Sequence, residues 1–107
     1  MLIIPTRPEP EYEFRIALDG TPYRIVKRWN TRSEHWTLDI LTDARERIIS
    51  GLKLVSDYTL LSHLVDPRLP PGEFIALDPR GNRVIRPGRD SFTDGSVILA
   101  YLTAAEL

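Results

Sequence analysis

The chain has 107 residues, of which 14 are basic and 15 acidic, and it contains no cysteine. This length predicts a single β domain over residues 1–107, with enough hydrophobic residues for a core that needs no covalent cross-link. The absence of cysteine excludes disulfides, thiolate metal sites and thiol nucleophiles. Positive and negative residues are interleaved, which argues against nonspecific nucleic-acid binding because that needs a basic cluster.

The first ten residues predict an extended arm. Pro5, Pro8 and Pro10 fall close together, and proline lacks the N–H group that a strand ladder needs. We therefore expect residues 1–10 to stay unpaired and to lie across a neighbouring subunit. Residues 1–5 are apolar but have no basic segment before them, so they do not predict a signal peptide. No stretch approaches the roughly 20 apolar residues of a membrane span, and we expect synthesis in a cytoplasm.

Residues 11–45 predict a meander of antiparallel strands. Their alternation places large apolar side chains on one face, namely Tyr12, Phe14, Ile16, Leu18, Tyr23, Ile25, Trp29, Trp36, Leu38 and Ile40. Asp19-Gly20 predicts a tight hairpin turn, because glycine accepts the positive φ that such turns need. Polar breaks at 31–34 and 42–45 predict two further hairpins. Trp29 and Trp36 should then face each other across the second hairpin.

The second half of the chain is less regular. Gly51 interrupts an apolar run and predicts a bulge or bend, for which a barrel corner is one explanation. Apolar residues at helical spacing predict one short helix near 57–65. A strand is expected over 73–78, a long loop over 79–95, and a final strand over 96–103 that is apolar on both faces. The predicted fold is therefore all-β, a small antiparallel barrel or sandwich built from successive hairpins.

The titratable residues do not predict a catalytic or metal site. His35 is expected at a hairpin end and His63 on the polar side of the helix, neither with metal-ligand spacing. An enzyme would have to use His63 with Asp66, without the rest of a site. Residues 90–95 resemble part of a calcium loop but lack its third ligand and distal glutamate. Ser50 lies at a bend without a base beside it, so we predict no enzyme, no cofactor and no metal.

The second hairpin allows more than one interpretation. Basic residues interleaved with aromatics would form a stacking platform for single-stranded nucleic acid or oligosaccharide on a small barrel, through Tyr23, Arg24, Lys27, Arg28 and Trp29. If the aromatic face is buried instead, Lys27 has to reach an edge or find a carboxylate. An interface is a third possibility. Asp39 is expected on the outward face, paired with an arginine or a backbone amide.

Seven pieces spread over the chain carry a family resemblance. They are Ile3-Ile4-Pro5, residues 14–23 with Leu18-Asp19-Gly20, Arg28-Trp29-Asn30, and residues 36–40, 51–55, 64–73 and 99–107. In this order they resemble the phage baseplate plug family, small structural proteins of contractile-tail baseplates. Residues 79–95 depart from the family pattern.

The resemblance implies a non-catalytic virion protein of the tail baseplate, near the axis where it contacts tube and hub proteins. It also implies a homo-oligomer of threefold or sixfold symmetry, with no membrane or nucleic-acid partner. We expect the arm and the last strand to supply the subunit contacts, so deleting the arm should block assembly and leave the domain folded. The residues expected at the interface are Ile3, Ile4, Pro5, Pro8, Leu69, Pro70, Pro71, Ile98 and Leu102.

Overall fold

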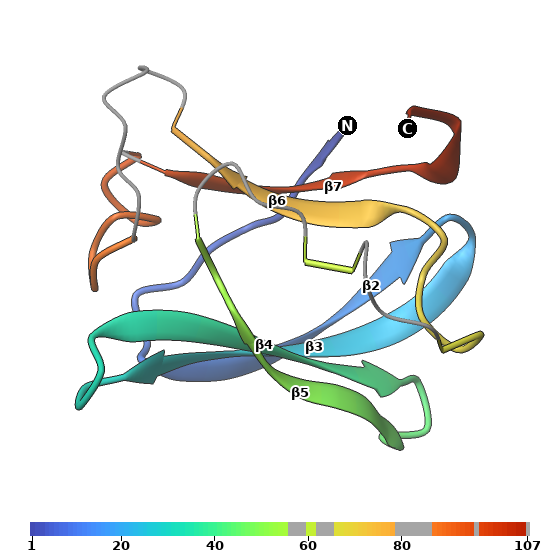
Figure 1. Ribbon diagram of the computed structural model, residues 1–107, viewed down its shortest axis with the longest axis horizontal. Helices are drawn as coiled ribbons and strands as arrows, with labels where there is room; N and C mark the ends of the chain where they lie inside the picture. The colour runs from blue at the N-terminus through green and yellow to red at the C-terminus, as the bar shows by residue number, and fades with distance from the viewer. Residues whose placement is uncertain (56–59, 62–65, 79–86, 96, 107) are drawn as a thin grey trace.

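A computed structural model of the chain describes residues 1–55, 60–61, 66–78, 87–95 and 97–106. Two antiparallel sheets face each other (Figure 1). The large sheet has the order β2-β3-β4-β5, formed by Glu11–Leu18, Thr21–Asn30, His35–Thr42 and Arg47–Lys53. The small sheet has the order β1-β7-β6, formed by Leu2–Ile3, Ile98–Leu102 and Glu73–Leu77, and a 3₁₀ turn follows at Ala104–Glu106. The all-β prediction is confirmed, and of its two architectures the chain forms the sandwich.

The large sheet is the predicted meander. Asp19 and Gly20 both have positive φ, 50° and 81°, as a two-residue hairpin turn requires. Trp29 and Trp36 are register partners, and their ring centroids lie 5.3 Å apart at an edge-on angle of 61°. Gly51 has a φ of 74°, and the β4–β5 register shifts beside it. The predicted bulge is therefore confirmed.

The core lies between the two sheets. Ile25, Leu38 and Ile40 of the large sheet and Phe74 and Leu99 of the small sheet have no exposed surface. Because side chains alternate along a strand, each sheet sends every second residue inward and leaves the others on its outer face. The described residues include no helix long and apolar enough to cross a bilayer.

Tyr101 ties the small sheet to the first hairpin. Its hydroxyl donates to an Asp19 carboxylate oxygen (2.7 Å) and accepts the Gly72 N–H (2.8 Å). Burial, together with the bond to Asp19, raises the pKa of the Tyr101 phenol. A side chain at position 72 would collide with the Leu102 carbonyl at 2.0 Å. Glycine at this position therefore lets the chain pass close to β7.

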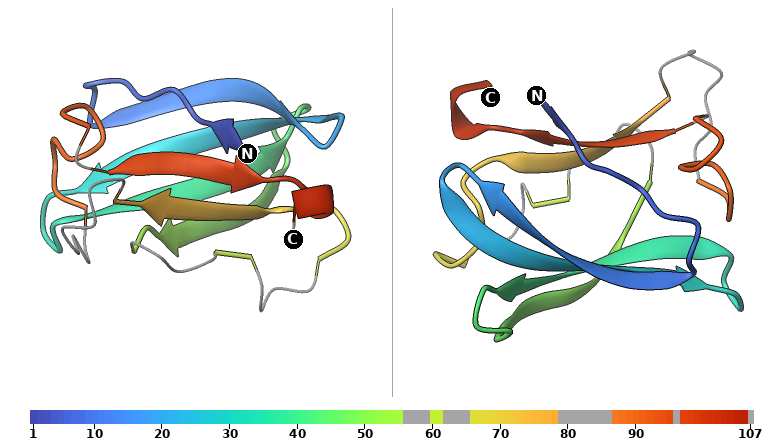
Figure 2. Two further views of the ribbon diagram at one scale, coloured as in Figure 1. Left: turned by 90° about the horizontal axis from the view of Figure 1, so that it is seen from above. Right: turned by 180° about the vertical axis from the view of Figure 1, so that it is seen from behind.

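The N-terminal arm differs from the prediction. Leu2 pairs with Tyr101 and Ile3 with Ala100, and the Ile4 N–H donates to the Leu99 carbonyl (2.9 Å). The expectation of an unpaired arm is wrong for these residues because the prolines begin only at Pro5, so the residues before it keep their N–H groups. β7 thus lies between β1 and β6, and Figure 2 (right) shows residues 1–10 running from the small sheet to the large one.

Two other predicted segments are described only in part. The helix expected near 57–65 lies outside the described residues except for Leu60 and Leu61, both of which are buried. The Leu60 N–H donates to the Phe74 carbonyl (3.2 Å) at the edge of β6. Residues 79–86 of the expected long loop are also outside the described part. Residues 87–95 form turns that bring Phe92 into the core at 5% exposure.

Candidate protein interface

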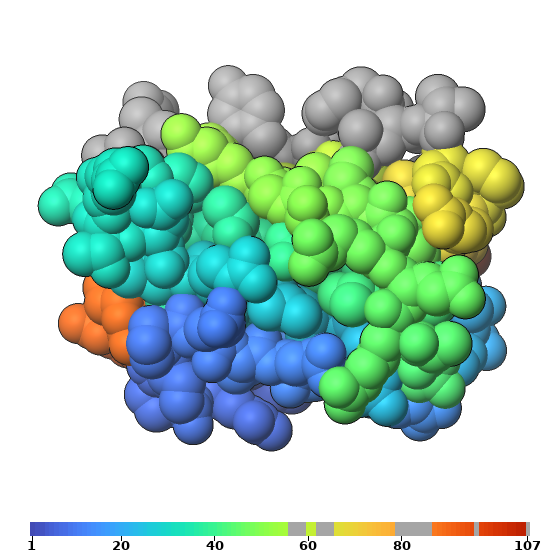
Figure 3. Space-filling model, turned by 90° about the horizontal axis from the view of Figure 1, so that it is seen from below, coloured from blue at the N-terminus to red at the C-terminus, as the bar shows by residue number. Residues whose placement is uncertain are grey.

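The outer face of the large sheet is covered by ion pairs. Figure 3 looks onto this face. The pairs are Arg15–Asp43 (2.7 Å), Arg24–Glu13 (3.4 Å), Arg45–Glu13 (3.3 Å), Arg28–Asp39 (3.3 Å) and Arg28–Glu11. Four of these pairs are at least partly exposed to water, where each contributes at most about 1 kcal/mol, whereas the Asp39 carboxylate of the Arg28–Asp39 pair is buried.

The outer face of the small sheet is apolar. Strand register places Ile3, Ala100 and Ile75 in one row across the sheet, and Leu77 beside Ile98 in the next. Leu102 completes this outer apolar face, and Figure 2 (left) shows the strands of the small sheet from above. Glu73 is the register partner of Leu102. Its side chain is buried and accepts the Leu61 N–H, so it adds no exposed charge to this face.

The outer face of the large sheet is therefore charged, whereas the outer face of the small sheet is apolar. Within the outer apolar face, Ile3 is 48% exposed, Ala100 is buried, and the other four residues are half-buried. An antiparallel sheet commonly packs one face on the core and turns a polar face to water, as the large sheet does. A second face without exposed charge in the described residues is typical of a protein contact.

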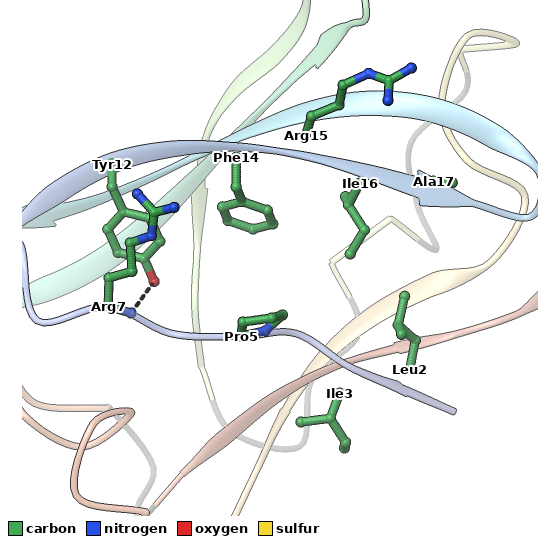
Figure 4. A pocket seen from close by; sticks show the side chains of 9 residues that line it. All are labelled: Leu2, Ile3, Pro5, Arg7, Tyr12, Phe14, Arg15, Ile16 and Ala17. Carbon is green, nitrogen blue, oxygen red and sulfur yellow. Dashed lines mark hydrogen bonds between the residues drawn. The ribbon is translucent and has the colours of Figure 1, made fainter.

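An apolar groove opens between the arm and the large sheet. Its cavity volume is about 440 Å³, and it is lined by Leu2, Ile3, Pro5, Arg7, Tyr12, Phe14, Arg15, Ile16 and Ala17. Figure 4 shows Phe14 and Ile16 pointing from β2 toward the arm, where Leu2 and Pro5 face them. The Tyr12 hydroxyl accepts the Arg7 N–H (3.3 Å) at one end. The arm thus spans this side of the sandwich without filling it.

The predicted interface residues divide into three groups. Ile3, Ile98 and Leu102 lie together on the outer apolar face. Pro5 and Pro8 are exposed along the arm, and Leu69, Pro70 and Pro71 lie in the connection before β6. Ile4 (2% exposed) and Pro70 are buried, so neither offers surface to a partner in this conformation.

The sequence prediction missed Ile75 and Leu77 of the outer apolar face. The signal was present, because strand 73–78 carries apolar residues on both faces in the same way as strand 96–103. Strand pairing between β6 and β7 is what joins the two strands into one surface.

Lys27 lies in an aromatic cage inside the sandwich. It is 1% exposed, and its Nζ lies 3.7 Å from the ring centroid of Phe92, 4.1 Å from that of Trp36 and 5.7 Å from that of Tyr12. Within the described part of the chain its Nζ has no hydrogen-bond partner. The expectation that Lys27 reaches an edge or a carboxylate is wrong, because ring faces attract the ammonium group instead.

Burial lowers the pKa of Lys27 to about 7, and the charge of Arg89 acts in the same direction. The stacking platform suggested by the sequence does not form. Tyr23 and Lys27 face the core, whereas Arg24 and Arg28 bind carboxylates on the opposite face of the same sheet.

Asp39 has both kinds of partner that the sequence predicted. Its Oδ1 accepts the Gly51 N–H (2.8 Å), and its Oδ2 lies 3.3 Å from the Arg28 guanidinium. It lies on the outward side of β4 but is only 1% exposed. The bulge in β5 brings a free backbone N–H over this carboxylate, which explains why an outward residue is covered.

The described residues contain no cluster of three or more histidine, aspartate or glutamate side chains that would hold a metal. His35 is half-buried at the start of β4, and His63 lies outside the described residues. Asp66 binds Arg68 through its carboxylate (3.0 Å). In residues 90–95 the Asp90 carbonyl accepts the Thr93 and Asp94 N–H groups, so the segment forms a turn.

These features define a class: a small β-sandwich protein with one charged and one apolar sheet face, suited to assembly with other subunits. A family model described as cyanophage baseplate Pam3 plug gp18 matches residues 1–104, and the chain belongs to this family. The resemblance seen in the sequence is therefore confirmed. No curated protein matches the chain. Membership makes it a structural protein of the phage baseplate that associates with other baseplate proteins.

Proposed function

We propose that the chain is a non-catalytic building block of a contractile-tail baseplate, contacting tube and hub proteins near the tail axis. In this role it forms a homo-oligomer, which we expect to have the threefold or sixfold symmetry of a tail axis, and closed symmetry is the norm for homo-oligomers. Family membership supports the baseplate location. The observation that carries the proposal is the outer apolar face of the small sheet.

The size of the hydrophobic effect supports a covered face. Fully burying one leucine or isoleucine side chain stabilises an interface by roughly 1.5–3 kcal/mol. Ile3, Ile98 and Leu102 lie on this face together with residues of β6, so subunit contact would remove several such side chains from water. The ion pairs of the large sheet leave its face hydrated, which gives the subunit a defined orientation in the assembly.

Arm deletion is a poor test of this proposal. Ile4 is buried in the core, so removing residues 1–10 would disturb folding as well as assembly. Substitution on the outer apolar face separates the two effects.

We expect a chain with Ile3→Glu and Ile98→Glu to fold, since neither position faces another carboxylate in the register, but to be excluded from assembled baseplates, because each carboxylate would lose its water in the interface. Circular dichroism and tryptophan fluorescence check the fold, and the protein content of purified particles checks assembly. Thr37→Glu is the matched control, because it adds a carboxylate beside Arg28 on the charged face. Normal incorporation of the double variant would refute the proposal.

A further inference from the structure

We propose that neighbouring copies exchange their N-terminal segments in the homo-oligomer. Residues 1–4 of one copy would pair with β7 of the next copy, in the position that each copy's own segment occupies here. This inference rests on the proposed homo-oligomer and names the contact that holds it together. Its occupant is a second copy of this chain.

The binding position on β7 is specific for this segment. Leu2 and Ile3 are in antiparallel register with it, and the Ile4 N–H bonds to Leu99. The Ile4 side chain enters the core and keeps only 2% exposure. An empty position would leave a free strand edge and an opening in the core, whereas the segment of another copy would fill both equally well. The edge of β7 therefore accepts residues 1–4 of any copy of this chain, its own or a neighbour's.

The segment leaves apolar surface exposed on its own domain. The Met1 amine pairs with Glu106, yet Met1 (57%), Leu2 (38%) and Ile3 (48%) are the exposed large hydrophobic residues in the part of the chain that the structure describes. The groove of about 440 Å³ separates the arm from Phe14 and Ile16 of β2 (Figure 4). Pairing of the segment within its own domain thus leaves apolar surface that a neighbour would cover.

Residues 5–10 are suited to carry the segment to a neighbour. Their three prolines favour an extended chain, and six extended residues span roughly 20 Å, comparable with the domain extents of 34 × 28 × 23 Å. Four hydrogen bonds hold this linker, namely Thr6 to the Phe92 carbonyl (3.2 Å), Arg7 N–H to Tyr12 (3.3 Å), Arg89 to the Pro8 carbonyl (2.6 Å) and Trp29 N–H to the Pro10 carbonyl (2.6 Å). Exchange of an identical element between protomers needs no new binding site.

The absence of native cysteine allows a direct test. Ile3 and Ala100 are register partners, and the adjacent bond from Ile4 to Leu99 makes them a non-hydrogen-bonded pair, whose side chains lie close together. Chains with Ile3→Cys alone and chains with Ala100→Cys alone, carrying different tags, are co-expressed and oxidised. Exchange predicts a disulfide between the two tagged chains in the oligomeric fraction, seen at twice the chain mass on a non-reducing gel.

Glu13→Cys and Val26→Cys provide the matched control. These residues are register partners on β2 and β3, which do not exchange, and the bond from the Trp29 N–H to the Pro10 carbonyl makes them a non-hydrogen-bonded pair as well. The two cysteines should cross-link within a doubly substituted chain but not between singly substituted chains. Oligomers in which Ile3→Cys and Ala100→Cys cross-link only within a doubly substituted chain would overturn the exchange and leave the proposed function standing. A chain that is monomeric at every concentration would contradict both.

Discussion

Lys27 shows how aromatic rings can replace a hydrogen-bonding partner for a buried charge. Three rings from β2, β4 and the turn at residues 87–95 surround its Nζ. The positive charge of Arg89 also lowers the pKa of Lys27. The rings favour the ammonium form, whereas burial and Arg89 favour the neutral amine. Burial prevails, and the pKa of Lys27 falls to about 7. The alternation of β3 predicted the inward direction of this side chain, but Phe92 comes from a distant segment that the local pattern does not reveal.

A pH dependence of stability follows from this pKa. The unfolded chain holds the Lys27 proton up to about pH 10.5, and the folded chain only up to about pH 7. Burying the charged amine therefore lowers the free energy of unfolding by its full amount below pH 7. This loss of stability shrinks as the pH rises and disappears near pH 10.5. In that window it changes by about 1.4 kcal/mol for each pH unit.

We expect Lys27→Met to remove this dependence, so that the stability of the variant relative to wild type falls as the pH rises above 7. Urea unfolding between pH 6 and pH 9.5 measures the difference. Lys53→Met, which replaces an exposed lysine of β5, should follow the wild-type profile. Parallel pH profiles for Lys27→Met and wild type would contradict the low pKa.

At the scale of the elements, local alternation predicted the four strands of the large sheet, because each strand pairs with the next along the chain. The small sheet was harder to predict. Its strands come from residues 2–3, 73–77 and 98–102, and pairing over such separations leaves no local pattern. The prolines of the arm also concealed a strand that ends before them. Ile98 and Leu102, which the sequence suggested as interface residues, lie on the outer face of β7, but the rest of their face required the pairing with β6.

Asp39 fastens the bulge of β5 to β4. Replacing it with alanine leaves the Gly51 N–H without its acceptor and Arg28 without a buried partner. We expect Asp39→Ala to lower the free energy of unfolding by about 1–3 kcal/mol, and Asp39→Asn to lower it less because the amide oxygen still accepts. Chemical unfolding provides the values.

The matched control for this bulge is Asp43→Ala. Asp43 forms its ion pair with Arg15 on the exposed face, where such pairs contribute between about 0 and 1 kcal/mol. An Asp39→Ala variant no less stable than Asp43→Ala would mean that the carboxylate does not hold the bulge.

At the scale of the whole molecule, the sandwich has two unlike outer surfaces. The large sheet turns ion pairs outward, and the small sheet turns outward a face of Ile3, Ile75, Leu77, Ile98, Ala100 and Leu102. The N-terminus lies beside the small sheet, where the Met1 amine pairs with Glu106. Membership in the baseplate plug family implies association with other baseplate proteins, and we propose that they contact this side.

A cryo-electron microscopy map of the assembled baseplate would show whether the outer apolar face is a subunit contact. We expect the outer face of β6 and β7 to be covered by another subunit, with Ile98 and Leu102 inside the contact and the Arg15–Asp43 pair of the large sheet in solvent. A map in which the β6–β7 face is open to solvent while the charged face is buried against a neighbour would contradict the account.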